Sequence, residues 1–415
     1  MVFCCLPAGN GVLRFWGMSA IAQNLPVNSI PAAHPAAEKS TALPWLSFVV
    51  ALAACCIPLG AQWDISWHQS IGRDSFWTPA HMMIYLGGAL PGILCGWVVL
   101  RRTFFASTDD HEPAVQLWGF RGPLGGWLTI WGSLAMLVSA PFDNWWHDAY
   151  GLDVQILSPP HTLLALGMTG VAVGAMVLAA SVRNRANDTQ RPMANAIFLF
   201  SCGTLVTMGM IFVMEYSFPN DQHTGLYYQV ICLLLPLYPV IAVRTTRMPL
   251  AATIVGSIYV LMVLLMVWVL PLFGAQPKLA PVWNPITHMV PPPWPVLAFV
   301  PALGVDLAHR FLGRERGFLR DSLLALVMGA LFFGLLLLVQ WNFSTFLLSP
   351  ASRNAFFVGD AVWSYGAGPG QWRHDLWHLQ ERPFTVMTVW SGILIAAVVC
   401  RVALWLGNWL GTVKR

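Results

Sequence analysis

Residues 250–273 read LAATIVGSIYVLMVLLMVWVLPLF, and this stretch, which contains no charged residue, decides the fold class. A helix rises about 1.5 Å per residue, so about 20 apolar residues cross the hydrocarbon core of a bilayer. The run is continuous rather than alternating, which excludes a strand of an outer-membrane barrel. The sequence therefore predicts a membrane-spanning helix here.

Similar runs recur along the whole chain. The composition is 57% hydrophobic and only 10% charged, whereas soluble domains carry roughly a quarter charged residues, so a soluble enzyme is excluded. Hydropathy predicts about ten spans, of which the eighth is short and proline-rich. They lie at 44–62, 81–100, 124–141, 161–182, 194–214, 226–243, 250–273, 294–308, 319–340 and 384–407. We expect an all-α, polytopic transmembrane helical bundle.

The basic residues predict how the bundle is oriented. Lys and Arg beside membrane spans stay on the cytoplasmic side, and here they collect in every second loop. Those loops hold Arg101, Arg102, Arg121, Arg183, Arg185, Arg191, Arg244, Arg247, Arg310, Arg314, Arg316 and Arg320. We expect a multi-pass protein of the inner (cytoplasmic) membrane with both termini cytoplasmic. The net charge of +4 is too small and too dispersed for a nucleic-acid surface.

Two of the opposite, outward-facing loops repeat one pattern. The first contains Asp64-x3-His68-x12-His81, and the second contains Asp143-x3-His147-x13-His161. Each unit also has a Gly-x-Asp in the loop and a proline two residues before the last histidine, at Pro79 and Pro159. An Asp and a His four residues apart lie on one helix face, and a proline suits the start of the next helix. Each unit is therefore predicted to be a helical hairpin that gathers one carboxylate and two imidazoles.

Such a group of side chains is typical of a metal site. The predicted ligands are Asp64, His68 and His81 in one hairpin and Asp143, His147 and His161 in the other. Imidazole with carboxylate suits copper, zinc, iron or nickel, and copper binds most tightly of these. Three ligands with an open position also suit catalytic zinc. A boundary belt of interfacial His and Trp residues is the structural alternative.

These features divide the chain into three expected parts. Residues 1–43 are rich in Pro, Ala and Ser and are expected to form a disordered cytoplasmic leader. Residues 44–220 would form the metal-binding bundle of two repeated hairpins, and residues 221–415 an additional transmembrane bundle. All eight cysteines fall in the leader or in predicted spans, so a disulfide framework is not expected.

The pattern resembles a known family. Asp64-x3-His68-x12-His81 is similar to the copper-binding motif in the C subunits of the copper membrane monooxygenases, which include particulate methane and ammonia monooxygenases. The unit with His147 and His161 is similar to the neighbouring second copper site of that family. There the position four before the first histidine is typically Asn, whereas this chain has Asp143. The resemblance covers residues 44–215 and implies copper sites on the periplasmic side.

The resemblance also implies partners and an activity. The family's C subunit works with A and B subunits and has about half as many spans as predicted here, so residues after 220 lie outside it. Membrane lipid and monooxygenase-type partner subunits, or a homo-oligomer, are the expected partners. The first hypothesis is a copper protein that oxidises a small lipophilic substrate with dioxygen. The alternatives are a zinc-dependent membrane hydrolase, a metal or small-molecule transporter, a metal-stabilised membrane subunit and a haem protein.

Overall fold

The chain is a multi-pass membrane protein built from long apolar helices. The computed structural model describes residues 44–72, 75–105, 113–151, 158–313, 315–368, 371–376 and 383–415. Within these ranges, nine helical segments are long and apolar enough to cross a membrane. The described residues form one compact unit. The leader expected at 1–43 lies outside the described residues.

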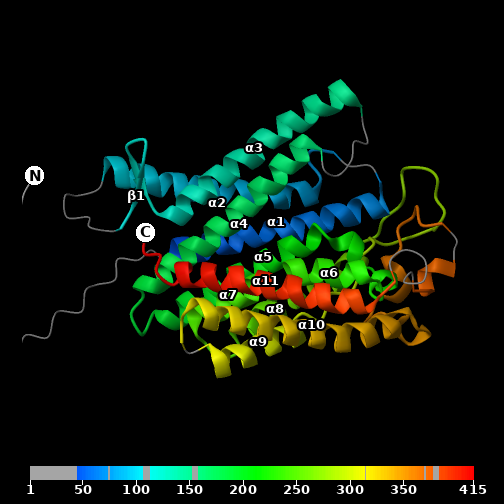
Figure 1. The fold of residues 1–415 in the computed structure, drawn as a ribbon. Helices are drawn as coiled ribbons and strands as arrows, with labels where there is room; N and C mark the ends of the chain where they lie inside the picture. The colour runs from blue at the N-terminus through cyan, green and yellow to red at the C-terminus, as the bar shows by residue number, and fades with distance from the viewer. Residues whose placement is uncertain are drawn as a thin grey trace, which may run out of the picture. The chain divides into compact units, whose positions relative to one another are not determined.

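Eleven α-helices make up the described bundle (Figure 1). They are α1 (Pro44–Ser70), α2 (Pro79–Phe104), α3 (Leu124–Tyr150), α4 (Pro159–Arg185), α5 (Arg191–Ile211), α6 (Gly225–Leu234), α7 (Leu237–Thr246), α8 (Ala251–Val269), α9 (Phe299–Leu312), α10 (Phe318–Leu348) and α11 (Val386–Leu410). Short 3-10 turns are η1 (Met214–Ser217), η2 (Pro219–Asp221), η3 (Leu270–Leu272), η4 (Pro350–Ser352), η5 (Gly359–Val362) and η6 (Gln371–His374).

One small β-hairpin interrupts the helices. Strands β1 (Val115–Leu117) and β2 (Phe120–Gly122) pair antiparallel in the loop after α2. Trp118 and Gly119 form the turn and both have positive φ, as a two-residue hairpin turn requires. The prediction of an all-helical chain is therefore correct for the spans and misses this hairpin, which is too short for hydropathy to reveal.

The helices run back and forth between two ends of the bundle (Figure 1). At one end of the bundle α1 and α3 end and α2 and α4 begin, and we call this the histidine end. We call the opposite end the arginine end. Helix α1 begins and α11 ends at the arginine end. Large apolar side chains, including Ile93, Leu137 and Leu338, lie exposed on outward helix faces. Such faces are suited to contact lipid rather than water.

Glycines let the first four helices approach closely. A Cβ added at Gly60 of α1 would lie 3.0 Å from the backbone nitrogen of Ile84 in α2. A Cβ at Gly132 of α3 would lie 2.5 Å from the backbone nitrogen of Val171 in α4. Small residues at such crossings hold membrane helices together by close van der Waals contact. The α1–α2 and α3–α4 hairpins predicted from the repeated motif are thus tightly packed pairs.

The eighth predicted span, 294–308, is not one continuous helix. Prolines 291–293 and 295 lack the N–H groups that a helix needs, so the chain is irregular until α9 begins at Phe299. Helix α9 has 14 residues and rises only about 21 Å, less than the thickness of a bilayer core. The sixth span is also interrupted, because α6 ends at Leu234 and α7 begins at Leu237, on either side of Pro236.

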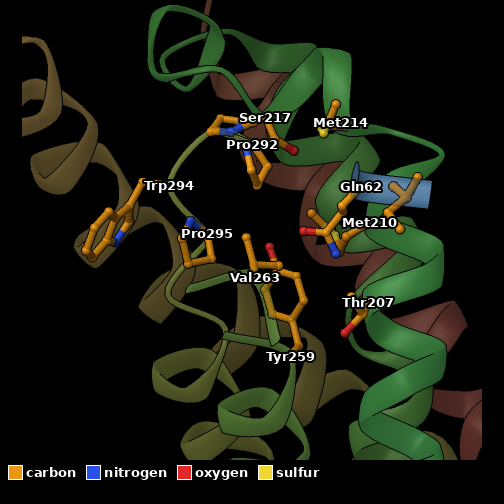
Figure 2. A pocket seen from close by; sticks show the side chains of 12 residues that line it. Gln62, Thr207, Met210, Met214, Ser217, Tyr259, Val263, Pro292, Trp294 and Pro295 are labelled. Carbon is orange, nitrogen blue, oxygen red and sulfur yellow. The ribbon is translucent and has the colours of Figure 1, made fainter. Parts of the chain in front are cut away.

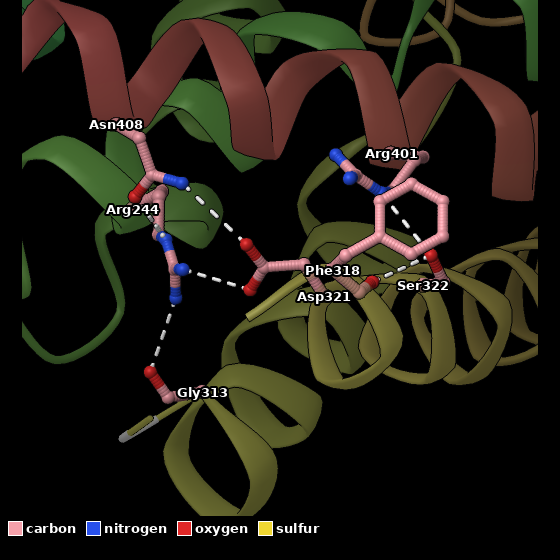
Figure 3. A network of polar contacts seen from close by, with 7 residues as sticks. All are labelled: Arg244, Gly313, Phe318, Asp321, Ser322, Arg401 and Asn408. Carbon is pink, nitrogen blue, oxygen red and sulfur yellow. Dashed lines mark hydrogen bonds and ion pairs between the residues drawn. The ribbon is translucent and has the colours of Figure 1, made fainter. Parts of the chain in front are cut away.

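A buried polar network ties the helices together at the arginine end (Figure 3). The guanidinium of Arg244 in α7 lies 2.8 Å from Asp321 Oδ1 in α10 and donates to Asn408 Oδ1 in α11 at 2.8 Å. It also donates to the carbonyl oxygen of Gly313 after α9. The side chain of Arg244 is almost fully buried, and it therefore joins α7 to α10, to α11 and to the residue that follows α9.

Candidate metal centre

The first motif lies across the α1–α2 hairpin at the histidine end. Helix α1 continues to Ser70, past the span expected from hydropathy, and so carries Asp64 and His68 on successive turns. Helix α2 begins at Pro79, with Thr78 in extended conformation before it. His81 therefore stands in the first turn of α2. The helix boundaries bring together the three residues that the sequence analysis selected.

One aspartate lies between the two histidines. His81 Nε2 is 3.1 Å from Asp64 Oδ1, and His68 Nε2 is 3.9 Å from Asp64 Oδ2. Asp64 Oδ1 is shielded from solvent and makes no hydrogen bond in the described residues. The ion pair with His81 is therefore the contact that offsets the cost of burying this oxygen. The side chains of Asp64 and His81 are each 22% exposed, whereas His68 is 50% exposed. Of the three side chains, His68 is thus the one that solvent reaches most easily.

The hydrogen bond of the other ring nitrogen of His81 determines what must lie between His81 and Asp64. His81 Nδ1 lies 2.9 Å from the carbonyl oxygen of Ser75. A carbonyl oxygen only accepts, so Nδ1 carries a proton and donates it. If Nε2 were then bare, its lone pair would face a carboxylate at 3.1 Å and repel it. A proton or a metal ion must therefore lie between Nε2 and Asp64.

The second motif repeats this arrangement in the α3–α4 hairpin. Asp143 and His147 both belong to α3, and His161 belongs to the first turn of α4. Ser158 caps α4, because its hydroxyl accepts from the backbone N–H of His161 at 3.4 Å. His161 Nε2 lies 3.4 Å from Asp143 Oδ1. The side chain of His147 lies outside the described part of the structure.

The distances can be tested against metal coordination. Two ligand atoms about 2.0–2.1 Å from one metal ion, at square-planar or tetrahedral angles, lie about 2.9–3.4 Å apart. The pairs Asp64–His81 and Asp143–His161 both fall in this range, at 3.1 and 3.4 Å. His68, at 3.9 Å, lies slightly beyond it. In the described residues no three His, Cys, Asp or Glu side chains already form a complete metal-binding group. Each carboxylate–imidazole pair therefore has the donor atoms and the spacing for two ligands of a metal, and the same spacing also suits a direct ion pair.

The two pairs differ in their surroundings. Asp143 and His161 are 33% and 39% exposed, more than the corresponding Asp64 and His81. Beside the first pair, the ring of Tyr85 lies 6.0 Å from His81. A less exposed site with aromatic neighbours strengthens electrostatic attraction to a bound cation. The first pair is therefore expected to hold a cation more tightly.

Other outward histidines have structural partners. His223 is 4% exposed, stacks on Trp341 and lies 2.8 Å from the carbonyl oxygen of Trp341. His374 Nε2 lies 3.4 Å from Asp360 Oδ1, a further carboxylate–imidazole contact that no helical spacing indicates, because the two residues lie far apart in an irregular loop. Asp360 was not selected from the sequence, and only the folding of this loop reveals the pair.

Comparisons of the chain with family models, with curated proteins and with solved structures found no match.

Proposed function

We propose that the chain is an integral membrane metalloprotein that binds copper through Asp64, His68 and His81, with a second site at Asp143, His147 and His161. The observation that carries the proposal is the contact between Asp64 and His81. With Nδ1 of His81 committed to the Ser75 carbonyl, a proton or a metal ion is required between Nε2 and Asp64. The repetition of the carboxylate–imidazole pair in the second hairpin supports a metal rather than an isolated protonated histidine.

The donor set favours copper over the other divalent metals. Imidazole nitrogen with carboxylate oxygen binds several first-row metals, and copper binds most tightly among them. The resemblance to the copper membrane monooxygenases points the same way. Bound copper would supply electron-transfer chemistry with dioxygen, and the proposed reaction is oxidation of a small lipophilic substrate. The histidine end would then face the periplasm, as the positions of the arginines favour.

Metal analysis with EPR tests the proposal on detergent-purified protein. The variants are His68→Ala/His81→Ala and His147→Ala/His161→Ala. His374→Ala is the matched control, because His374 also contacts a carboxylate at the histidine end but belongs to neither motif. Stepwise loss of copper with each double variant, and no loss with His374→Ala, would support two copper sites. Oxygen consumption with small hydrocarbons or ammonia would then test the reaction.

Two other results would overturn parts of the proposal. Zinc in place of copper would replace oxidation by a zinc-dependent hydrolysis, in which the metal activates water. No metal in any preparation would leave a proton shared between His81 and Asp64 and would refute the metalloprotein.

A small-molecule transporter is the second candidate, and one observation favours it. The irregular residues 289–298 before α9 lie buried within the bundle, and broken spans of this kind line binding sites in transporters. Uptake of candidate substrates into proteoliposomes, compared with empty liposomes, separates transport from oxidation.

A further inference from the structure

The irregular segment 290–298 is held inside the bundle by polar side chains. The hydroxyl of Ser70 accepts from the N–H of Val290 at 2.7 Å, and the Tyr259 hydroxyl oxygen accepts from the N–H of Val296 at 3.3 Å. Gln340 accepts from the N–H of Leu297 at 3.1 Å. Backbone without helical bonds is tolerated at membrane depth only where protein surrounds it or where it lines a cavity. Buried polar groups of α1, α8 and α10 therefore fix the path of this segment.

A pocket lies against the segment (Figure 2). Its free volume is about 30 Å³, room for a few non-hydrogen atoms, so small molecules fit and bulky ones do not. Prolines 292, 293 and 295 form one wall, and α1, α5 and α8 form the others. None of the described residues that line it carries a charged side chain, and most are apolar. The pocket therefore suits a neutral molecule with a small apolar body.

One polar atom of the pocket lacks a partner. Gln62 is 2% exposed, and its Oε1 has no hydrogen bond in the described residues, whereas its Nε2 donates to the Pro58 carbonyl within α1. Figure 2 shows the Gln62 amide directed into the space between α1 and the proline wall. A buried acceptor that lacks a donor destabilises the protein. An occupant with an O–H or N–H group would remove this destabilisation.

A second polar group can complement the first. The oxygen of Tyr259 accepts from Val296, so its own O–H proton remains available to a ligand that accepts. An acceptor at Gln62 and a donor at Tyr259 match a hydroxyl group, which both donates and accepts. We propose that this pocket binds a small neutral molecule with one hydroxyl group, that is, a short-chain alcohol.

The proposal is independent of the metal centre. Residues two apart on a helix point about 200° apart, so Gln62 faces away from the side of α1 that carries Asp64. Loss of metal at Asp64 would therefore leave alcohol binding at Gln62 unchanged.

Saturation-transfer NMR on the full chain in lipid nanodiscs tests the proposal. The probes are 1-propanol and its isomer ethyl methyl ether, which has similar size but no O–H donor. Wild type is expected to bind 1-propanol about tenfold more tightly than the ether, the difference that one good hydrogen bond makes. Gln62→Leu is expected to abolish this preference. Thr169→Val, which alters a separate apolar cavity between α4 and α5, is the matched control and should keep it.

Each other outcome overturns the proposal. Equal signals for alcohol and ether in wild type would mean that the probes only partition into lipid, and this comparison needs no variant. A preference that survives in a folded Gln62→Leu protein, as judged by gel filtration and circular dichroism, would place alcohol binding elsewhere. If Gln62→Leu does not fold, Tyr259→Phe provides the second test of the same preference.

Discussion

His81 faces Asp64 across 3.1 Å with Nε2, while its Nδ1 donates to the carbonyl of Ser75. The backbone carbonyl thus selects which nitrogen of His81 meets the carboxylate, because it accepts only from a protonated Nδ1. Histidine ligands of metals are commonly oriented in this way by a partner on the far nitrogen. The proposed metal centre therefore depends on a side chain from each helix of the hairpin and on the loop between them.

Asp64→Asn is expected to weaken metal binding at the first site. The amide keeps the size of the side chain but removes the negative charge that faces His81. We expect a loss in affinity of at least about 10-fold, on the order that metal-site substitutions cause. Isothermal titration with copper measures it. Asp148→Asn is the control, because Asp148 is exposed in α3 and bonds Asn144. An equal loss in both variants would contradict a role for Asp64.

Gly132→Ala is expected to destabilise the α3–α4 hairpin. A Cβ there would lie 2.5 Å from the backbone nitrogen of Val171, and backbone cannot move aside as a flexible side chain can. Overpacking of this kind costs about 1–3 kcal/mol. Unfolding of the purified protein in a denaturing detergent measures the loss. Gly96→Ala in α2 is the control, since a Cβ there meets nothing within 4 Å. Equal stability of the two variants would show that the close crossing is not required.

Arg244→Met is expected to be strongly destabilising. It would leave the buried carboxylate of Asp321 without its cation. Breaking a buried pair in this way costs about 3–5 kcal/mol. Arg320→Ala is the control, because Arg320 pairs with Glu315 on the exposed surface, where an ion pair contributes about 0–1 kcal/mol.

The double variant Arg244→Met/Asp321→Leu tests the reason for this loss. Because it removes both charges, it is expected to be more stable than Arg244→Met alone. The same detergent unfolding assay compares them. A double variant less stable than the single one would show that the hydrogen bonds to Asn408 and Gly313, and not the unpaired charge, dominate.

The arginine end is also expected to respond to pH. His309 belongs to α9, outside the nine candidate spans of the described residues, and burial, followed by the charges of Arg244 and Arg247, lowers its pKa to about 4. The folded state therefore binds a proton less readily than the unfolded state. The stabilisation is complete above pH 6.5 and is lost as pH falls from there to about 4.

The size of the effect is on the order of 1–3 kcal/mol. Thermal unfolding over the range from about pH 7.5 to about pH 4 measures it, and His309→Phe should flatten the dependence over that interval. A slope that is identical in wild type and His309→Phe would assign the pH response to other groups.

The apolar runs by themselves determined the helical membrane architecture. Inside a bilayer the backbone N–H and C=O groups have no water to bond. Runs of about 20 apolar residues therefore form helices, in which the backbone satisfies its own hydrogen bonds. The motif spacing also determined which residues meet, since Asp64 and His68 share a helix face and Pro79 starts the next helix beside His81. These relations are local, and local relations can be read from spacing.

The tertiary structure alone decided the path of residues 290–298, the pocket beside Gln62 and the pairing of Arg244 with Asp321. The partners of these groups come from helices far away in sequence, so no periodicity marks them. Hydropathy predicted a span at 294–308 because its residues are apolar, but the prolines prevented a continuous helix, and Ser70, Tyr259 and Gln340 supplied the bonds that the helix would have made. Long-range hydrogen bonds therefore decided the path of this segment, which its apolar composition did not determine.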